Sequence, residues 1–287
     1  MGRVAYVNGR YLEHSQAVVH VEDRGFQFAD AVYEVWAVFD GKLADCDGHF
    51  NRLDRSLSEL SIDQPMSRAA LRMVIGETLR RNRIKDGMVY LQISRGVAKR
   101  DHAFPDPAPL PTLVLTAKSI NYDALNAKAA KGVSVITQPD IRWGRCDIKT
   151  VGLLPNAMAK TLAHDAGAEE AWLVDEMGLV TEGASTNAWI VDASGTLRTR
   201  DTQANILRGI TRATLIERLT EEGIEFSEKP FSVEEAKGAK EAFLTAASAF
   251  VLPIVQIDNI TIGNGQPGPL SLKLRGLYME TARRTAT

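Results

Sequence analysis

The segment Arg142-Trp143-Gly144-Arg145-Cys146-Asp147-Ile148-Lys149-Thr150 places one lysine near the end of an expected strand. Apolar Ile148 and Val151 flank Lys149 closely in the sequence, and two arginines precede it. Apolar surroundings and neighbouring cations both disfavour an ammonium, so such a lysine suits a neutral amine that forms a Schiff base. The local sequence leaves a second interpretation open, in which Lys149 only caps the end of the strand.

Helices and strands are expected on both sides of this segment without regular βαβ alternation, which argues against a Rossmann or TIM architecture. Asn8-Gly9 and Asp40-Gly41 are hairpin-turn signals, and Ser67 is a suitable N-cap. Apolar and β-branched runs predict strands at 3–7, 11–13, 17–20, 32–39, 42–44, 88–94, 112–119, 133–138, 147–150, 170–174, 179–191, 196–198, 241–245 and 255–257. Apolar spacing predicts helices around 50–60 and at 66–82, 156–166, 211–222, 233–239 and 270–284.

This order predicts an α+β fold with two lobes. We expect a smaller N-terminal lobe at 1–120, a linker rich in Ala and Lys at 121–131, and a larger C-terminal lobe at 132–287 that carries Lys149.

The composition excludes several classes of protein. The 287 residues are 45% hydrophobic and 24% charged, with a formal net charge of -2 and no cluster of Lys and Arg, so no nucleic-acid partner is expected. No signal-peptide pattern and no apolar run of roughly 18 residues is present, so no membrane association is expected either. Cys46 and Cys146 form no disulfide framework or zinc-finger spacing, which indicates the cytoplasm and no metal.

Three further segments carry residues suited to a cofactor or a substrate. Thr181-Glu182-Gly183-Ala184-Ser185-Thr186-Asn187 interrupts a strand with small residues, where a carboxylate can face a ring nitrogen or, alternatively, water in a β-bulge. Leu207-Arg208-Gly209-Ile210-Thr211-Arg212 precedes a helical segment, with Thr211 as the expected N-cap, and suits phosphate binding or ordinary capping. Arg100 and His102 alternate, so they can hold a carboxylate together or lie in a solvated turn.

In this order, the motifs resemble those of the fold-type IV enzymes that use pyridoxal 5'-phosphate (PLP), and within them the D-amino acid aminotransferases. The resemblance covers nearly the whole chain. The matching segments are Asp23-Arg24-Gly25-Phe26-Gln27-Phe28-Ala29-Asp30-Ala31-Val32-Tyr33-Glu34, His49-Phe50-Asn51-Arg52-Leu53, Arg95-Gly96, Arg100 to Pro105, Cys146 to Lys149, Thr181 to Gly183, Ser185 to Asn187 and Leu207 to Thr211.

The resemblance implies a role for each candidate residue. It implies that Lys149 forms the Schiff base with PLP and shuttles the proton, and that Glu182 pairs with the pyridine nitrogen. Phosphate would be bound by Arg52, by the backbone N–H groups of Ile210 and Thr211, and by Ser248, while Leu207 would pack on the ring. The substrate carboxylate would be bound by Tyr33, Arg100 and His102, the last two from the neighbouring subunit of a homodimer. The expected reaction moves an amino group from a small-molecule donor, a D-amino acid such as D-alanine, to a 2-oxo acid.

The sequence departs from the family pattern at a few positions. Ala246 and Ala247 stand where hydroxyl side chains usually face the phosphate, so backbone N–H groups or Ser248 would substitute. Ala29 and Ala31 replace common glycines, and Phe26 a common tyrosine.

Related activities share Lys149 and Glu182, so these two residues do not separate them. The alternatives are a branched-chain L-amino acid aminotransferase, an (R)-selective amine transaminase and a 4-amino-4-deoxychorismate lyase. The Arg100 and His102 pair favours the D-amino acid branch. A non-catalytic protein that merely binds PLP is disfavoured by the intact set of lysine, glutamate and arginine.

Overall fold

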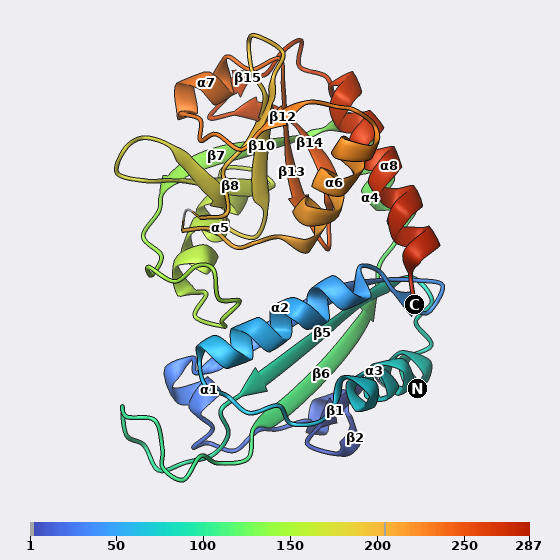
Figure 1. Ribbon diagram of the computed structural model, residues 1–287, viewed down its shortest axis with the longest axis vertical. Coiled ribbons are helices and arrows are strands. Elements are labelled where there is room, and N and C mark those ends of the chain that lie inside the picture. The colour runs from blue at the N-terminus through green and yellow to red at the C-terminus, as the bar shows by residue number, and fades with distance from the viewer. Residues whose placement is uncertain (1–2, 204) are drawn as a thin grey trace. The chain divides into compact units, whose positions relative to one another are not determined.

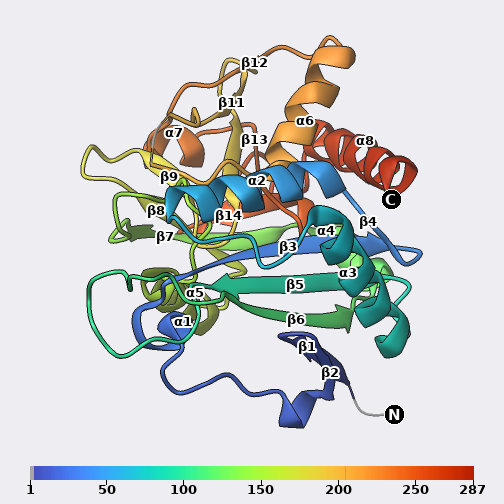
Figure 2. The same ribbon diagram turned by 60° about the horizontal axis from the view of Figure 1, so that its bottom comes forward.

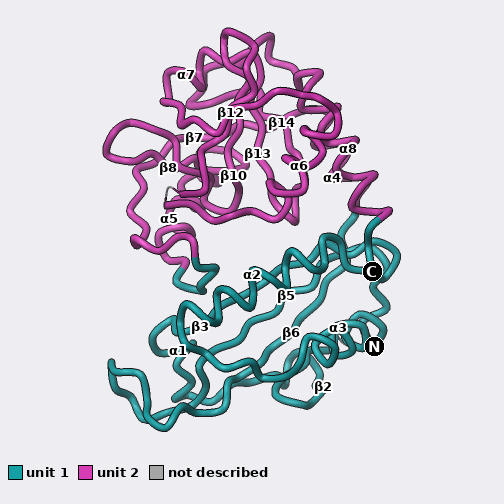
Figure 3. The backbone as a smooth tube through the Cα atoms, viewed as in Figure 1, with its two compact units in different colours: residues 1–121, 148–152, 285–287 teal, residues 122–147, 153–284 magenta. Residues whose placement is uncertain are grey.

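The computed structural model describes residues 3–203 and 205–287, which form two compact units (Figures 1 and 3). Unit 1 contains the described residues up to Asn121, together with Ile148–Gly152 and Thr285–Thr287. Unit 2 contains Tyr122–Asp147 and Leu153–Arg284. Within the described ranges, no helix combines the length and the apolarity that crossing a bilayer requires.

Unit 1 is built on a six-stranded antiparallel sheet in the order β2-β1-β6-β5-β3-β4. Its elements are β1 (Val4–Val7), β2 (Arg10–Glu13), the 3-10 turn His14–Gln16, α1 (Arg24–Phe28), β3 (Ala31–Phe39), β4 (Lys42–Leu43), α2 (Cys46–Glu59), α3 (Arg68–Asn82), β5 (Gly87–Ser94) and β6 (Thr112–Ser119). Alternation along β5 buries Val89, Leu91 and Ile93 in the core of the unit. The apolar stripe of α2, which includes Phe50 and Leu53, packs into the same core.

Unit 2 is built on a nine-stranded mixed sheet, counted over the described residues. The order is β12-β11-β10-β13-β14-β7-β8-β9, with β15 paired to β14. Its strands are β7 (Val133–Pro139), β8 (Glu170–Val174), β9 (Val180–Gly183), β10 (Asn187–Val191), β11 (Leu197–Thr199), β12 (Phe226–Ser227), β13 (Glu241–Ala246), β14 (Phe250–Ile257) and β15 (Ile260–Thr261). Its helices are α4 (Tyr122–Lys131), α5 (Leu154–Asp165), α6 (Ile210–Glu221), α7 (Val233–Lys237) and α8 (Pro269–Thr285).

The central strands of unit 2 are covered on both faces. All five residues of β10 are buried, which explains why Ala188–Val191 is a continuous apolar run rather than an alternating one. Helix α5 contacts β7 and β8, α6 contacts β13, and α4 and α7 contact β14 (Figure 2). These helices and the mixed sheet give the α+β class that the sequence predicts.

The division into lobes differs from the expected one in three places, one of which is that Thr285–Thr287, expected in the C-terminal lobe, belong to unit 1. Residues 122–131, expected as a linker, form α4 and belong to unit 2. Alanine and lysine are strong helix formers, and Asp123 near the start and Lys131 near the end suit the helix dipole. Lys149, expected in the C-terminal lobe, belongs with Ile148–Gly152 to unit 1.

Three local predictions are wrong and one is confirmed. Residues 17–20 form no strand, and 147–150 make only a single bridge, between Thr150 and Val32. The N-cap of α6 is Gly209 rather than Thr211. Ser67 caps α3 as expected, because its side chain accepts a hydrogen bond from the Ala70 N–H.

Candidate active site

Two main-chain hydrogen bonds, at Lys149 and two residues after it, fix the lysine segment to β3. The Tyr33 N–H donates to the Lys149 carbonyl at 2.9 Å, and the Val151 N–H donates to the Ala31 carbonyl at 3.1 Å. The Lys149 side chain is half-buried, with Nζ 4.0 Å from the centroid of the Tyr33 ring. Among the residues that the structure describes, no carboxylate pairs with this amine. The amine is therefore held by an aromatic face and is not neutralised by an anion.

Tyr33 is itself held by a second tyrosine. Its ring stacks on Tyr90 with centroids 5.6 Å apart and an interplanar angle of 29°. Burial raises the pKa of Tyr90 to about 12, and its hydroxyl donates to Gln92 Oε1 at 2.8 Å. Tyr90 therefore stays neutral at ordinary pH and acts as a packing partner for Tyr33.

Arg52 lies in a buried cluster on α2 and β3. Its Nε donates to Glu34 Oε1 at 2.7 Å, and its Nη2 donates to Glu34 Oε2 at 2.9 Å. His49 Nδ1 lies 2.7 Å from Glu34 Oε2. Burial alone would favour the protonated form of Glu34, but Arg52 and His49 outweigh it and hold the Glu34 pKa well below its usual range. Glu34 thus fixes the orientation of the guanidinium that the sequence assigns to phosphate.

Arg100 and His102 lie beside the same aromatic ring. The Arg100 guanidinium is 5.2 Å from the centroid of the Phe28 ring, and the His102 ring centroid is 5.6 Å from it. Both residues are exposed. The structure therefore brings together two polar side chains that the sequence predicts to act on one carboxylate.

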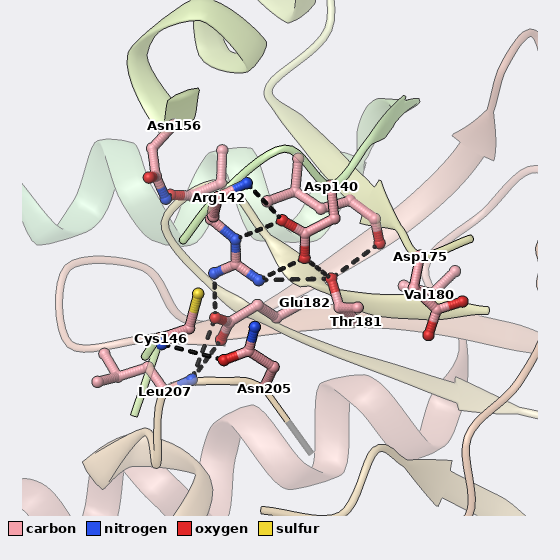
Figure 4. Close-up of polar contacts among 12 residues, drawn as sticks. Asp140, Arg142, Cys146, Asn156, Asp175, Val180, Thr181, Glu182, Asn205 and Leu207 are labelled. Carbon is pink, nitrogen blue, oxygen red and sulfur yellow. Dashed lines mark hydrogen bonds and ion pairs between the residues drawn. The ribbon is translucent and has the colours of Figure 1, made fainter. Parts of the chain in front are cut away.

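Glu182 of β9 is buried in unit 2, with 4% of its surface exposed, so the alternative of a water-facing glutamate is wrong. Figure 4 shows the Arg142 guanidinium paired with Glu182 Oε1. The Asn187 side-chain amide donates to Oε2 at 2.9 Å, and the Leu207 N–H donates to the two carboxylate oxygens at 3.1 and 3.2 Å. Residues from three separate segments therefore fix both oxygens of this carboxylate.

Arg142 is a residue whose role the sequence interpretation missed. Its guanidinium also donates to both oxygens of Asp140, at 2.9 and 2.8 Å, and the Thr181 hydroxyl donates to Asp140 Oδ2 at 2.8 Å (Figure 4). Burial acts against the charged form of Arg142, but Asp140 and Glu182 outweigh it and raise the Arg142 pKa. The sequence interpretation assigned this cation to the surroundings of Lys149, whereas it pairs with two carboxylates. The signal available in the sequence is Asp140, two positions before Arg142.

Burial also sets the protonation of Glu182. It raises the Glu182 pKa above that of an ordinary glutamate, and the Arg142 guanidinium and the Leu207 N–H offset part of the rise. Arg142 and the Leu207 N–H thus favour the ionised carboxylate, which is the form that pairs with a protonated pyridine nitrogen.

The start of α6 presents backbone N–H groups without a side-chain cap. Its N-cap, Gly209, has no side chain, so the first-turn N–H groups, which include those of Ile210 and Thr211, have no acceptor within the helix. The Thr211 hydroxyl is buried and lies 3.5 Å from the Tyr278 hydroxyl, so it takes no part in capping. A Cβ at Gly209 would collide with Asn187 Oδ1, which explains the glycine. The remaining phosphate candidate, Ser248, is exposed in the turn between β13 and β14.

Taken by unit, these groups fit the three polar parts of PLP. Lys149 of unit 1 is a primary amine suited to an aldehyde, and Glu182 of unit 2 is a buried carboxylate suited to a ring nitrogen. The uncapped start of α6 in unit 2 suits a phosphate.

Comparison with known proteins identifies the family. A model described as amino-transferase class IV matches residues 31–257. The chain therefore belongs to the class IV aminotransferases. It is 41% identical over 281 residues to D-alanine aminotransferase of Bacillus licheniformis, covering 96% of this chain and 98% of that protein. It is 39% identical to D-alanine aminotransferase of Staphylococcus haemolyticus, covering 94% of each.

Solved structures confirm the fold. A branched-chain amino acid aminotransferase of T.th., solved with pyridoxamine 5'-phosphate, matches with a TM-score of 0.88 and 27% identity over 99% of this chain and 96% of that one. The Escherichia coli branched-chain enzyme, at 22% identity and a TM-score of 0.87, matches over 97% of its own chain and 100% of this one and supports the fold alone. The expected two-lobed α+β fold and the resemblance to fold type IV are confirmed, and the chain is a PLP-dependent aminotransferase.

Proposed function

We propose that the chain transfers the amino group of a D-amino acid, such as D-alanine, to a 2-oxo acid. The observation that carries the choice of substrate is the pair Arg100 and His102 beside the Phe28 ring. A guanidinium and an imidazole held together bind a carboxylate by charge-assisted hydrogen bonds. Identity of 36–41% to D-alanine aminotransferases over nearly the whole chain supports the same substrate class.

Lys149 carries the chemical step in this proposal. PLP, once bound, supplies the electron sink that makes the Cα–H bond of the substrate acidic. Lys149 would hold PLP through its side-chain amine. Once the substrate amine takes its place there, the neutral Lys149 amine would accept the Cα proton and later return it. The Tyr33 ring and the main-chain bonds to β3 keep this amine in place.

The other cofactor residues bind and orient. Glu182 pairs with the ring nitrogen, and its own partners Arg142, Asn187 and Leu207 fix its two oxygens. Leu207 would also pack on the ring. Arg52, the N–H groups of Ile210 and Thr211, and Ser248 would bind the phosphate.

The substrate carboxylate is held by Tyr33, Arg100 and His102. We propose a homodimer in which each subunit supplies Arg100 and His102 to its neighbour, working in the cytoplasm. The orientation of the Cα–H bond relative to the ring then follows from the fixed carboxylate, and this selects the enantiomer.

A branched-chain L-aminotransferase is the second candidate, because solved structures of such enzymes share the fold at 27% identity. The two candidates differ in the donor that they accept. The PLP-loaded protein should be mixed separately with D-alanine, L-leucine and (R)-1-phenylethylamine, with no oxo acid, while the visible absorbance of the cofactor is followed. Rapid bleaching with D-alanine alone is expected; bleaching with L-leucine or the amine instead would overturn the substrate. Repeated pyruvate release from 4-amino-4-deoxychorismate, with no amino acceptor present, would instead identify the lyase.

The same experiment with Lys149→Ala tests the amine. We expect no half-reaction turnover, since no other group is assigned to the proton. The measurement is the bleaching rate with D-alanine after equal loading with PLP. A wild-type rate in this variant would remove Lys149 from the mechanism.

Arg100→Ala tests the carboxylate site. We expect the KM for D-alanine to rise about 10- to 100-fold, as for the loss of a charge-assisted hydrogen bond, with PLP affinity unchanged. Lys99→Ala is the matched control, because it removes an exposed cation from the adjacent position. Equal D-alanine kinetics in the two variants would contradict the role of Arg100.

A further inference from the structure

A buried charge cluster lies under the loop that carries Arg100 and His102. Its members are Arg24, Asp30 and Arg95, exposed by 2%, 9% and 4%. Arg24 Nε and Arg95 Nε each lie 2.7 Å from Asp30 Oδ2, and Arg95 Nη2 lies 3.0 Å from Oδ1. Two guanidinium groups therefore share one carboxylate, which leaves a buried excess of positive charge among these three residues.

Other N–H groups of the two arginines donate to carbonyl oxygens. Arg95 donates to the Ser61 and Leu60 carbonyls at 2.9 and 2.7 Å, at the end of α2. Arg24 Nη1 donates to the Asp101 carbonyl at 2.7 Å, and its Nη2 lies 3.5 Å from the His102 carbonyl. Arg24 thus binds the backbone of the two consecutive residues that follow Arg100.

Aromatic contacts hold the same loop at two more points. The Arg95 guanidinium lies 3.6 Å from the centroid of the Phe104 ring. The Arg24 guanidinium lies 4.7 Å from the centroid of the Phe28 ring, the ring that also contacts Arg100 and His102. All these residues belong to unit 1, where the loop between β5 and β6 runs past α1 (Figure 1).

We infer that Arg24 is a positioning residue. By holding the backbone of Asp101 and His102, it orients the loop so that the Arg100 and His102 side chains can bind one carboxylate together. This inference rests on the proposed function, since it assigns the substrate carboxylate to these two side chains. The planar fork of arginine is needed, because one head group must bond the Asp30 carboxylate and the Asp101 carbonyl at once. A lysine has one charged nitrogen and reaches only one of these acceptors well.

Arg24→Gln tests the inference by two independent measurements. Asp30 keeps both of its bonds to Arg95 in this variant, so we expect the protein to fold. Displacement of a binding group by about 1 Å costs roughly 100-fold, so we expect the KM for D-alanine to rise about 10- to 100-fold, with a smaller change in kcat. PLP affinity should not change. Arg24→Lys should fall between Arg24→Gln and the wild type.

Trypsin cleavage after Lys99 and Arg100 measures the loop directly and needs no substrate. Arg24→Gln should be cut at these exposed bonds at least several-fold faster than the wild type. Arg81→Gln is the matched control, because Arg81 also lies in unit 1, stacks on an aromatic ring, Tyr11, and pairs with a carboxylate, Glu77. It should change neither the cleavage rate nor the KM.

The outcomes separate the inference from the proposed function. Faster cleavage with a raised KM supports the inference. Unchanged cleavage, or faster cleavage with an unchanged KM, overturns the inference about Arg24. In that case the proposed function still stands, provided that the wild type turns over D-alanine. A wild type that does not accept D-alanine overturns both. If Arg24→Gln fails to fold, Phe104→Leu replaces it: Phe104 is 57% exposed, and its loss should shift cleavage and KM in the same direction by a smaller factor.

Discussion

At the scale of single residues, buried carboxylates with several donors define the polar chemistry of both units. Glu34 in unit 1 and Glu182 in unit 2 each pair with an arginine and with at least one further donor. A buried carboxylate without such partners would take up a proton. The arginines therefore determine how much negative charge each carboxylate keeps: Arg52 for Glu34, and Arg142 for Glu182.

The Arg142→Met substitution should lower the unfolding free energy by an amount that depends on pH. The variant leaves Glu182 and Asp140 buried without their shared cation, so it should lose about 3–5 kcal/mol of unfolding free energy at pH 8. Loss of the cation raises the pKa of both carboxyl groups in the folded state above the unfolded values. Lowering the pH to 5 then lets the folded state take up protons, so the loss should shrink.

Urea denaturation of both proteins at pH 8 and pH 5 measures this difference. Arg145→Met is the control, because its guanidinium pairs with Asp147 at the surface, and it should cost less than about 1 kcal/mol at either pH. A cost for Arg142→Met that is the same at both pH values would mean that the two carboxylates do not gain protons.

The sequence predicts candidate residues better than it predicts their partners. Glu182 stands out because a carboxylate interrupts a strand, but its bonds to Arg142 and Leu207 join positions 40 and 25 residues apart. No local pattern specifies such pairs. The prediction that Arg142 lies near Lys149 was wrong for this reason. It assumed that charged residues close in the sequence also interact with one another in the fold.

At the scale of elements, local signals decide where the prediction succeeds. Ser67 starts α3, and the alternation in β5 matches its buried face, because both depend on residues within a few positions. Helix α4 was missed because its weak apolar stripe resembles a linker, although its composition favours a helix. Helix α1 was missed because five residues carry too little periodicity, and the Asp23 cap is its main signal.

Gly209 at the start of α6 and Asn187 of β10 should be coupled in their effect on stability. Gly209 has ordinary helical-cap angles, so alanine is tolerated by the backbone, but its Cβ would collide with Asn187 Oδ1. Gly209→Ala should therefore displace the Asn187 amide from Glu182 and from the Leu207 carbonyl, and lower stability by about 1–3 kcal/mol. In an Asn187→Ala background the collision is absent, so the added cost of Gly209→Ala should nearly vanish.

A double-mutant cycle by urea denaturation checks this coupling, with PLP affinity as a second readout. Gly276→Ala in α8 serves as the control, because a Cβ there meets nothing within 4 Å and alanine favours a helix. Additive costs for Gly209→Ala and Asn187→Ala would show that the two positions are independent.

At the scale of the whole molecule, the chain passes from one unit to the other after Asn121, Asp147, Gly152 and Arg284. The short segment Ile148–Gly152, which carries Lys149, therefore returns to unit 1 before Leu153–Arg284 continues unit 2. Sequence order suggested instead that everything after the linker forms one lobe. The assignment of Lys149 to unit 1 depends on hydrogen bonds from Tyr33 to Lys149 and from Val151 to Ala31. These join positions more than a hundred residues apart, which no local pattern reveals.

The membership of the lysine segment in unit 1 predicts how its amides exchange with solvent. Leu53→Ala opens the core of unit 1 and Phe231→Ala opens that of unit 2, each at a cost of about 2–5 kcal/mol. In cofactor-free protein, exchange at Val151 should accelerate with Leu53→Ala and stay unchanged with Phe231→Ala, because its acceptor is the Ala31 carbonyl. Deuterium uptake of a peptide spanning 148–152 measures this exchange. The Ala184 amide, which donates to Ala171 within unit 2, should instead exchange faster with Phe231→Ala and stay unchanged with Leu53→Ala. Equal acceleration at Val151 by both substitutions would mean that the segment does not unfold with unit 1 alone.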